Sequence, residues 1–250
     1  MPKIVKATKK PEFLGKHLLF ITAHPDDETF SSAGTIALNN TAGGKTWVVC
    51  ATSGEKGSSH LAKPVSEAKL KRMREAELRA VAKLISIQKI FFLRFPDTLL
   101  NKHSVKFYKK SLGVAKQFDP EYIFSFGPDG GSGHLDHIAA HEVSARIAVE
   151  TGAGLVNFAF SSNFKTRHLK NLMARRAKGR YIPKLKPLKA NCVVPIDYKF
   201  KMKAASLHAS QFNGSNPMGQ MPKTVTQKIF STEQFYIYPK NSVKKIRKRK

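Results

Sequence analysis

The sequence lacks any long apolar run, and this absence excludes a membrane-spanning helix. No stretch approaches the roughly 20 apolar residues that a span requires, and the charged residues 1–10 are not followed by the apolar stretch of a signal peptide. We therefore expect a soluble, cytoplasmic protein without a transmembrane segment. The sequence has only two cysteines, Cys50 and Cys192. They are too few for a disulfide framework or a thiolate zinc cage, so we expect both to be buried and reduced.

Acidic residues are scarce, above all in the C-terminal part of the chain. The 250 residues include 44 Lys and Arg but 17 Asp and Glu, a formal net charge of +27, and residues 151–250 hold only two acids, Asp197 and Glu233. Basic residues crowd 165–189 and the end of the chain. We predict a basic insertion or loop at 163–190 and a basic tail at 241–250. An anionic membrane surface, nucleic acid or another anionic polymer would suit such charge, as would plain solvation without a partner.

Apolar residues make up 41% of the sequence, which is enough for a sizeable core, and the length suits one domain, placed here at 1–240. Short apolar runs alternate with helical patterns. This alternation predicts an α/β fold in three layers, with helices on both faces of a mostly parallel sheet. The expected strands are 18–23, 46–51, 89–94, 122–126, 155–160 and 192–196. The expected helices are 29–40, 66–86, 105–118, 135–150 and 198–209, and 230–240 reads equally as a final strand or a loop.

The segment 23–28, Ala-His-Pro-Asp-Asp-Glu, ends the first expected strand and opens a helix. Its ionisable side chains are costly to bury next to an apolar strand unless a cation compensates their charge. An acidic helix start would explain a single Asp, but not a histidine with three acids. His24 and Asp27, three residues apart across a turn, can point at one centre. Asp26 would then be directed elsewhere and could act on a bound water.

The segment 127–137 follows the fourth expected strand and is rich in glycine and histidine. Glycines let the backbone approach a ligand closely. His134 and His137 are clustered too tightly to be explained as ordinary core or surface residues, whereas His141 could be purely structural. Ligands in open α/β sheets bind beyond the carboxyl ends of strands, where both segments are expected.

Two histidines, one carboxylate and an open position for water form a sensible catalytic zinc site. The most economical ligand set is His24, Asp27 and His137, although iron(II) would accept the same donors. Asp26 is placed to serve as the general base. His134 could stabilise an oxyanion or protonate a leaving amine. Asp136 could hold His134 or His137 in the required orientation.

Together, the AHPDDE and GHLDH motifs resemble the PIG-L/LmbE-like family of zinc-dependent N-acetylglucosamine de-N-acetylases. The resemblance runs from about His17 to Gln211. Three further stretches look like family segments: 52–57, the arginine-containing 74–77, and 203–211. The resemblance implies a Rossmann-like fold, the metal ligands His24, Asp27 and His137, the general base Asp26, and oxyanion stabilisation or acid catalysis by His134. It also suggests substrate contacts from Arg74 and from residues of the late segment.

We therefore predict a hydrolase that removes acetyl from an N-acetylated amino sugar, such as an N-acetylglucosamine glycan, glycolipid or glycoside, by attack of a zinc-activated water. Plausible substrate contacts are Arg74, Asp97, His208 and Gln211. The sequence departs from the family pattern at Leu135, where proline is usual. Two alternatives stay open. One is a protein that binds an anionic polymer through its basic C-terminal half, and the other is a metal-dependent phosphoesterase.

Overall fold

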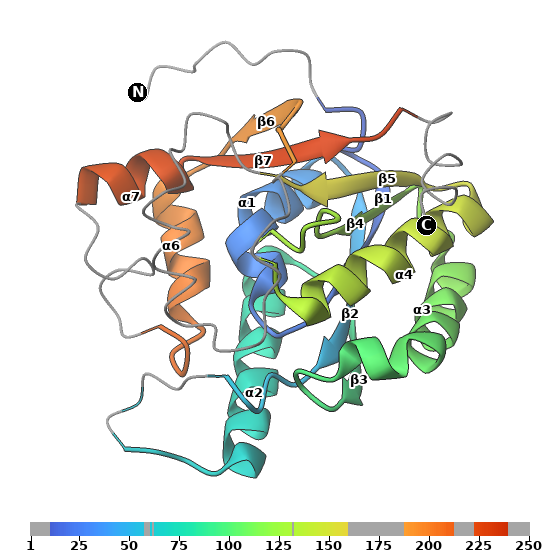
Figure 1. Ribbon diagram of the computed structural model, residues 1–250. Coiled ribbons are helices and arrows are strands. Elements are labelled where there is room, and N and C mark those ends of the chain that lie inside the picture. Colours follow the sequence, from blue (N-terminus) through green and yellow to red (C-terminus); the bar gives the residue numbers. More distant parts are fainter. Residues whose placement is uncertain are drawn as a thin grey trace.

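A seven-stranded sheet lies at the centre of the computed structural model (Figure 1), which describes residues 11–57, 61, 63–131, 133–159, 188–212 and 223–239. The strand order is β3-β2-β1-β4-β5-β7-β6. The neighbours among the first five strands in this order pair in parallel, and β7 is antiparallel to both β5 and β6. The strands are β1 His17–Thr22, β2 Lys45–Thr52, β3 Lys89–Phe95, β4 Tyr122–Ser125, β5 Gly154–Phe158, β6 Cys192–Pro195 and β7 Thr232–Ile237.

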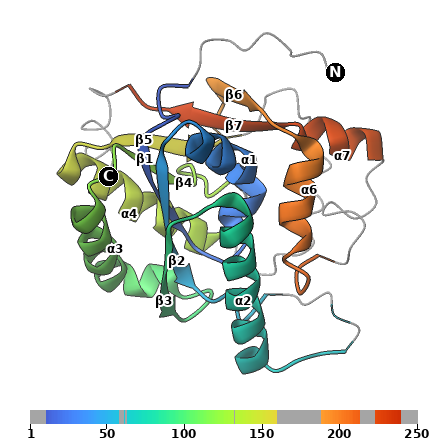
Figure 2. The ribbon, with the colours of Figure 1, turned by 180° about the vertical axis from the view of Figure 1, so that it is seen from behind.

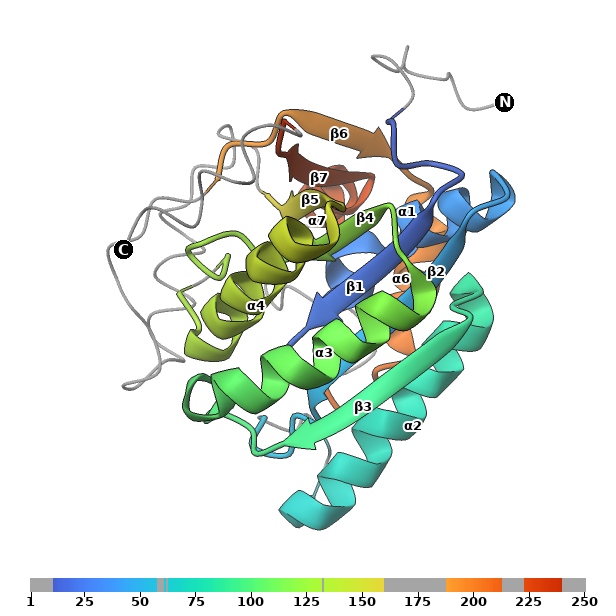
Figure 3. The same cartoon turned by 90° about the vertical axis from the view of Figure 1, so that its right-hand side faces the viewer.

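Helices cover both faces of this sheet. One face carries α1, α2 and α6, and the opposite face carries α3 and α4 (Figures 2 and 3). The predicted three-layer, Rossmann-like architecture is therefore confirmed. Within it, β1 is buried on both faces, in agreement with its unbroken apolar run. The helices are α1 Asp27–Thr41, α2 Glu67–Ile85, α3 Ser104–Phe118, α4 Leu135–Thr151, α6 Tyr198–Ser206 and α7 Lys223–Phe230, with a short 3-10 turn, η1, at Leu100–His103.

The order of the strands reverses between β1 and β4. The chain proceeds from β1 to β2 and β3 on one side, then crosses to β4 and continues to β5 on the other. The loops that leave β1 and β4 therefore diverge to opposite faces and open a crevice between them, which is the usual ligand position in such sheets. Both motif segments leave these two strands.

All six expected strands and five expected helices are present, with small differences at their ends. The stretch left open at 230–240 contains strand β7, and helix α7 before it was not predicted. Glu233 connects β7 to two of the covering helices. Its buried carboxylate accepts hydrogen bonds from Gly34 N and Thr35 N of α1 and pairs with Lys201 Nζ of α6 at 2.8 Å.

The predicted basic loop at 163–190 lies outside the described residues except for 188–190, and the tail at 241–250 lies wholly outside them. The described helices include none with the length and apolar character needed to cross a membrane.

Candidate metal and catalytic site

Two helix starts bring the motif residues together. The 23–28 segment links β1 to α1, and Asp26 is the N-cap of α1. The 127–137 segment links β4 to α4, and His134 is the N-cap of that helix. Because β1 and β4 are neighbours in the sheet, the two segments meet at the strand-order reversal. The sequence placed both segments beyond strand ends but did not predict this strand order.

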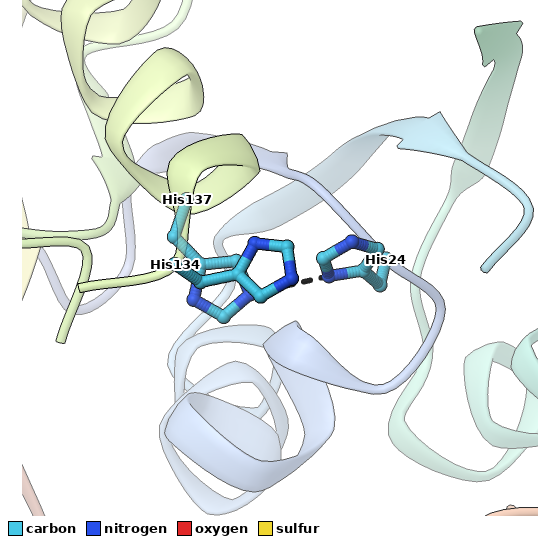
Figure 4. Close-up of side chains that lie close together, drawn as sticks. All are labelled: His24, His134 and His137. Atoms are coloured by element: carbon cyan, nitrogen blue, oxygen red, sulfur yellow. Dashed lines mark hydrogen bonds between the residues drawn. The ribbon is translucent and has the colours of Figure 1, made fainter. Parts of the chain in front are cut away.

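His24, Asp27 and His137 converge on one point. His24 Nδ1 lies 3.1 Å from His137 Nε2, and the two rings point at each other from the two segments (Figure 4). The Asp27 carboxylate completes the group, with Oδ2 at 3.7 Å from His24 Nδ1 and Oδ1 at 3.5 Å from His137 Nε2. Ligands of a tetrahedral zinc ion with bonds of about 2.0–2.1 Å are about 3.3 Å apart. The two histidine nitrogens lie near this separation, and each has a different Asp27 oxygen within 3.7 Å.

The hydrogen bonds of the two imidazoles show that lone pairs face this point. His137 Nδ1 lies 3.0 Å from the carbonyl oxygen of Gly130, which can only accept, so the proton of a neutral ring belongs on Nδ1. His24 Nε2 lies between two carboxylates, so its proton belongs on Nε2. His24 Nδ1, His137 Nε2 and Asp27 are then all acceptors. When His24 is neutral, these three acceptors face one another without a donor, and a bound cation would compensate them. In the protein without an ion, a second proton on His24 does so, in agreement with its raised pKa.

The backbone holds Asp27 in this position. Its Oδ2 accepts hydrogen bonds from Ala23 N at 3.0 Å and from His24 N at 2.8 Å. The described residues also contain two other groups with metal-ligand geometry, and both include His24: one adds His134 and His137, the other Asp97 and Asp136.

Asp136 contacts two histidines of the site. Its backbone N–H donates to His134 Nδ1, and its carboxylate faces His24. Oδ2 lies 3.4 Å from His24 Nε2. Asp97 Oδ1 lies 3.2 Å from the same nitrogen. Burial opposes protonation of His24, but these two carboxylates outweigh it and raise the pKa of His24 to about 10 in the protein without an ion.

Asp26 adopts a strained backbone conformation beside the converging ligands. Its φ of 129° lies in a region that L-residues rarely adopt, and such strain is stored at functional sites at a cost of about 1–3 kcal/mol. Asp26 Oδ2 lies 3.1 Å from Nη2 of Arg74. Burial raises the pKa of Asp26 to about 6, against the opposing effect of the Arg74 charge.

His134 stands next to His137, with ring centroids 4.8 Å apart. Its Nδ1 accepts a hydrogen bond from Asp136 N at 3.1 Å, so a neutral His134 carries its proton on Nε2. Burial and the neighbouring His137 and His24 lower the pKa of His134 to about 3. This environment favours a neutral hydrogen-bond donor rather than a protonated acid.

Three of the four predicted substrate contacts are nearly inaccessible to solvent. Arg74 is 4% exposed and donates to Gly54 O and Pro25 O as well as contacting Asp26. Asp97 is 3% exposed, and His208 is fully buried with Nε2 at 2.9 Å from Thr29 Oγ1. Gln211 is half-buried and remains a predicted contact. In the structure, Arg74 and His208 form hydrogen bonds with other residues of the protein. Their contacts with substrate stay predictions.

Glu77 supports the site from α2, a role that the sequence did not predict. Its carboxylate accepts hydrogen bonds from Ser210 N at 2.7 Å and Ser210 Oγ at 2.8 Å, which fixes the loop that carries Gln211. One sequence feature could have indicated this role: Glu77 follows Arg74 by three residues, so both side chains lie on the same side of α2. The Asp97 contact with His24 was also missed, and no local pattern indicates it.

The fold and this histidine–carboxylate centre define a Rossmann-like α/β protein with a candidate metal site at the strand-order reversal. The sequence model of the GlcNAc-PI de-N-acetylase family, PIG-L, matches residues 19–148, just over half of the 250-residue chain. The matched span contains both motifs. The chain therefore belongs to the PIG-L family.

Similar proteins include curated bacterial deacetylases. The chain is 31% identical over 160 residues to 1D-myo-inositol 2-acetamido-2-deoxy-alpha-D-glucopyranoside deacetylase 2 of Catenulispora acidiphila, covering 55% of this chain and 52% of that protein. A deacetylase of the same description from Acidothermus cellulolyticus is 24% identical over 259 residues, covering 89% and 88% of the two chains. The chain spans about half the length of the first relatives it matches.

Solved structures share the fold. The N,N'-diacetylchitobiose deacetylase of Pyrococcus horikoshii has a TM-score of 0.59 at 21% identity, covering 91% of this chain and 85% of its own. GalB, the 4-carboxy-2-hydroxymuconate hydratase of Pseudomonas putida KT2440, has the same TM-score at 17% identity, covering 90% and 97%. The fold therefore hosts more than one reaction, and the residues of the site, not the fold, indicate the function.

Proposed function

We propose that this protein is a zinc-dependent hydrolase that removes the acetyl group from an N-acetylglucosamine-type amino sugar. The convergence of His24 Nδ1, Asp27 and His137 Nε2 within 3.1–3.7 Å is the observation on which the proposal mainly depends. Three acceptors with buried surroundings suit a divalent ion, and nitrogen with carboxylate oxygen suits zinc, with iron(II) as the alternative metal. When bound, zinc would polarise the acetyl carbonyl and lower the pKa of a water molecule.

Asp26 serves as the general base in this proposal. A carboxylate with a pKa of about 6 is ionised at neutral pH and still basic enough to accept a proton from the attacking water. It passes this proton to the amine, which leaves with acetate as the second product. Arg74 fixes the carboxylate through its contact at 3.1 Å.

His134 stabilises the oxygen of the acetyl carbonyl as negative charge develops on it. Its proton resides on Nε2 because Nδ1 accepts the Asp136 N–H, and the lowered pKa keeps the ring neutral. A neutral imidazole can donate this hydrogen bond without first taking up a proton. Removing one donor of this kind costs about 100–1000-fold in kcat in well-studied hydrolases.

The substrate class follows from the relatives. Both similar curated deacetylases are described as acting on an acetamido-glucopyranoside, and the family model names GlcNAc-PI. An acetylated amine on a glucose-type ring is common to these descriptions. We infer that this chain accepts the same group, and that half-buried Gln211, held through Ser210 and Glu77, lines the sugar position.

The test is metal content measured together with acetate release from a panel of N-acetylglucosamine glycosides. Wild-type protein is expected to bind about one zinc per chain and to release acetate. His24→Ala is expected to lose both. Asp26→Asn is expected to keep the metal and to lose about 100–10,000-fold in kcat, because only the proton acceptor is removed.

His141→Gln is the matched control for His137→Gln. His141 lies one turn further along α4 and bonds to Phe126 O at 2.9 Å, away from the converging ligands. It should keep the metal, whereas His137→Gln should not. Metal-loaded protein that releases phosphate from phosphoesters, or that hydrates an unsaturated acid, but releases no acetate would contradict the proposal.

A further inference from the structure

Two carboxylates from different loops contact the same nitrogen of His24. Asp97 Oδ1 lies 3.2 Å from His24 Nε2, and Asp136 Oδ2 lies 3.4 Å from it. Asp97 is 3% exposed and Asp136 is fully buried. A metal-bound histidine usually donates its second N–H to a single acceptor. Here the Nε2–H group of His24 faces two carboxylates. One acceptor would be enough, so the second buried carboxylate requires an explanation.

Backbone N–H groups hold both carboxylates in place. Asp97 Oδ2 accepts from Lys56 N at 2.9 Å. Asp136 Oδ2 accepts from Thr98 N at 2.8 Å and its Oδ1 from Leu100 N at 3.0 Å. Neither carboxylate can swing away without breaking these bonds, so the pair forms a fixed support for the His24 ring.

We propose that Asp97 and Asp136 together position His24 for metal binding. The inference rests on the proposed metal site. The pair keeps the proton on Nε2 and leaves the Nδ1 lone pair directed at His137 and Asp27. It also supplies negative charge that increases the electron density His24 offers to a cation.

The arrangement also ties together the loops that surround the site. His24 lies in the loop after β1, and Asp97 follows β3. Asp97 N donates to Glu55 Oε1 at 3.0 Å, so the loop after β2 is included as well. Asp136 brings in the start of α4. A single imidazole therefore connects the carboxyl ends of four neighbouring strands, and its orientation depends on all of them.

The two carboxylates are partly redundant, and this gives the proposal a distinctive signature. Loss of either one leaves the other to accept the Nε2 proton, so each single variant should weaken zinc binding about 10-fold, the lower end of the range for such outer partners. Loss of both carboxylates leaves the Nε2 proton of His24 without either of these acceptors. The double variant should therefore weaken zinc binding by more than the product of the single effects.

The experiment compares zinc affinity, by competition with a chelator, in wild-type protein, Asp97→Asn, Asp136→Asn and the double variant. Asparagine keeps the shape of the side chain, but its NH2 group must face one of the backbone or imidazole N–H donors. Glu75→Gln is the charge control, because Glu75 is buried near the site but bonds to Ser53 and Arg94. Nitrogen NMR of labelled histidine in zinc-loaded protein reports the Nε2 proton of His24.

The expected result is weakened zinc binding in both single variants, a greater than multiplicative loss in the double variant, an altered His24 signal, and wild-type behaviour of Glu75→Gln. Wild-type zinc affinity in Asp97→Asn would overturn the proposal. So would two zinc ions per chain with the second lost in Asp97→Asn, because His24, Asp97 and Asp136 would then be ligands themselves. Absence of acetate release with this affinity pattern intact would contradict the proposed function and leave the positioning role standing.

Discussion

Asp26 and Arg74 show how one buried cation sets the working range of the proposed base. The Arg74 charge lowers the pKa of Asp26 against the larger effect of burial, which leaves it at about 6. Arg74→Gln should therefore raise this pKa, so that Asp26 loses its proton only at higher pH. The acidic limb of kcat/KM against pH is expected to move to higher pH in the variant. Arg74→Lys keeps the positive charge and should shift the acidic limb less. An unchanged acidic limb in both variants would contradict this account.

His141 should make the protein sensitive to acid, independently of catalysis. Burial lowers the pKa of His141 to about 4, below the usual 6.5. The unfolded chain therefore takes up this proton first as the pH falls, and stability is lost between pH 6.5 and 4 and levels off below. The expected loss is on the order of 3 kcal/mol. Urea unfolding of metal-free protein should show a smaller loss in His141→Gln, and equal losses in both proteins would exclude His141 as the cause.

At the scale of elements, the loop after β2 depends on a glycine to reach Arg74. Gly54 has a φ of +64°, and a Cβ atom built on it would lie 2.0 Å from Arg74 Nη1. Gly54→Ala is expected to displace Arg74 and lower activity at least tenfold while zinc stays bound. Gly113→Ala is the control, because Gly113 lies in α3 with no atom near its Cβ position. This control should raise stability by about 0.5–1 kcal/mol without changing activity.

The sequence predicted the elements better than the contacts between them. Strands such as β1 and β2 are recognisable because their apolar runs are local, and the two motifs could be placed because both follow strands. The partner of Asp136 could not be predicted. It lies 112 positions away at His24, and only the packing of β1 against β4 brings them together. The burial of Arg74 likewise depends on Gly54 and Pro25, which are distant in sequence.

At the scale of the whole molecule, exposed lysines lie on the side of the site as well as at the opposite edge of the sheet. Helix α3 contains no acid, and Lys102 and Lys106 are exposed where η1 and α3 begin. This edge follows the carboxyl end of β3 and so lies on the side of the sheet where the candidate site opens. Lys45 and Lys83 are exposed at the opposite edge, at the start of β2 and the end of α2.

The net charge of +27 and the lysines beside the site predict that anionic amino sugars are drawn to the site by charge. For a phosphorylated N-acetylglucosamine substrate, kcat/KM should fall several-fold between low and high salt, whereas a neutral glycoside should change little. Lys102→Gln/Lys106→Gln should reduce this salt dependence, because the cations at the site edge are removed. Lys45→Gln/Lys83→Gln removes the same charge at the far edge and should leave it nearly unchanged. Equal salt dependence for the two substrates would mean that the net charge of +27 has no part in substrate capture.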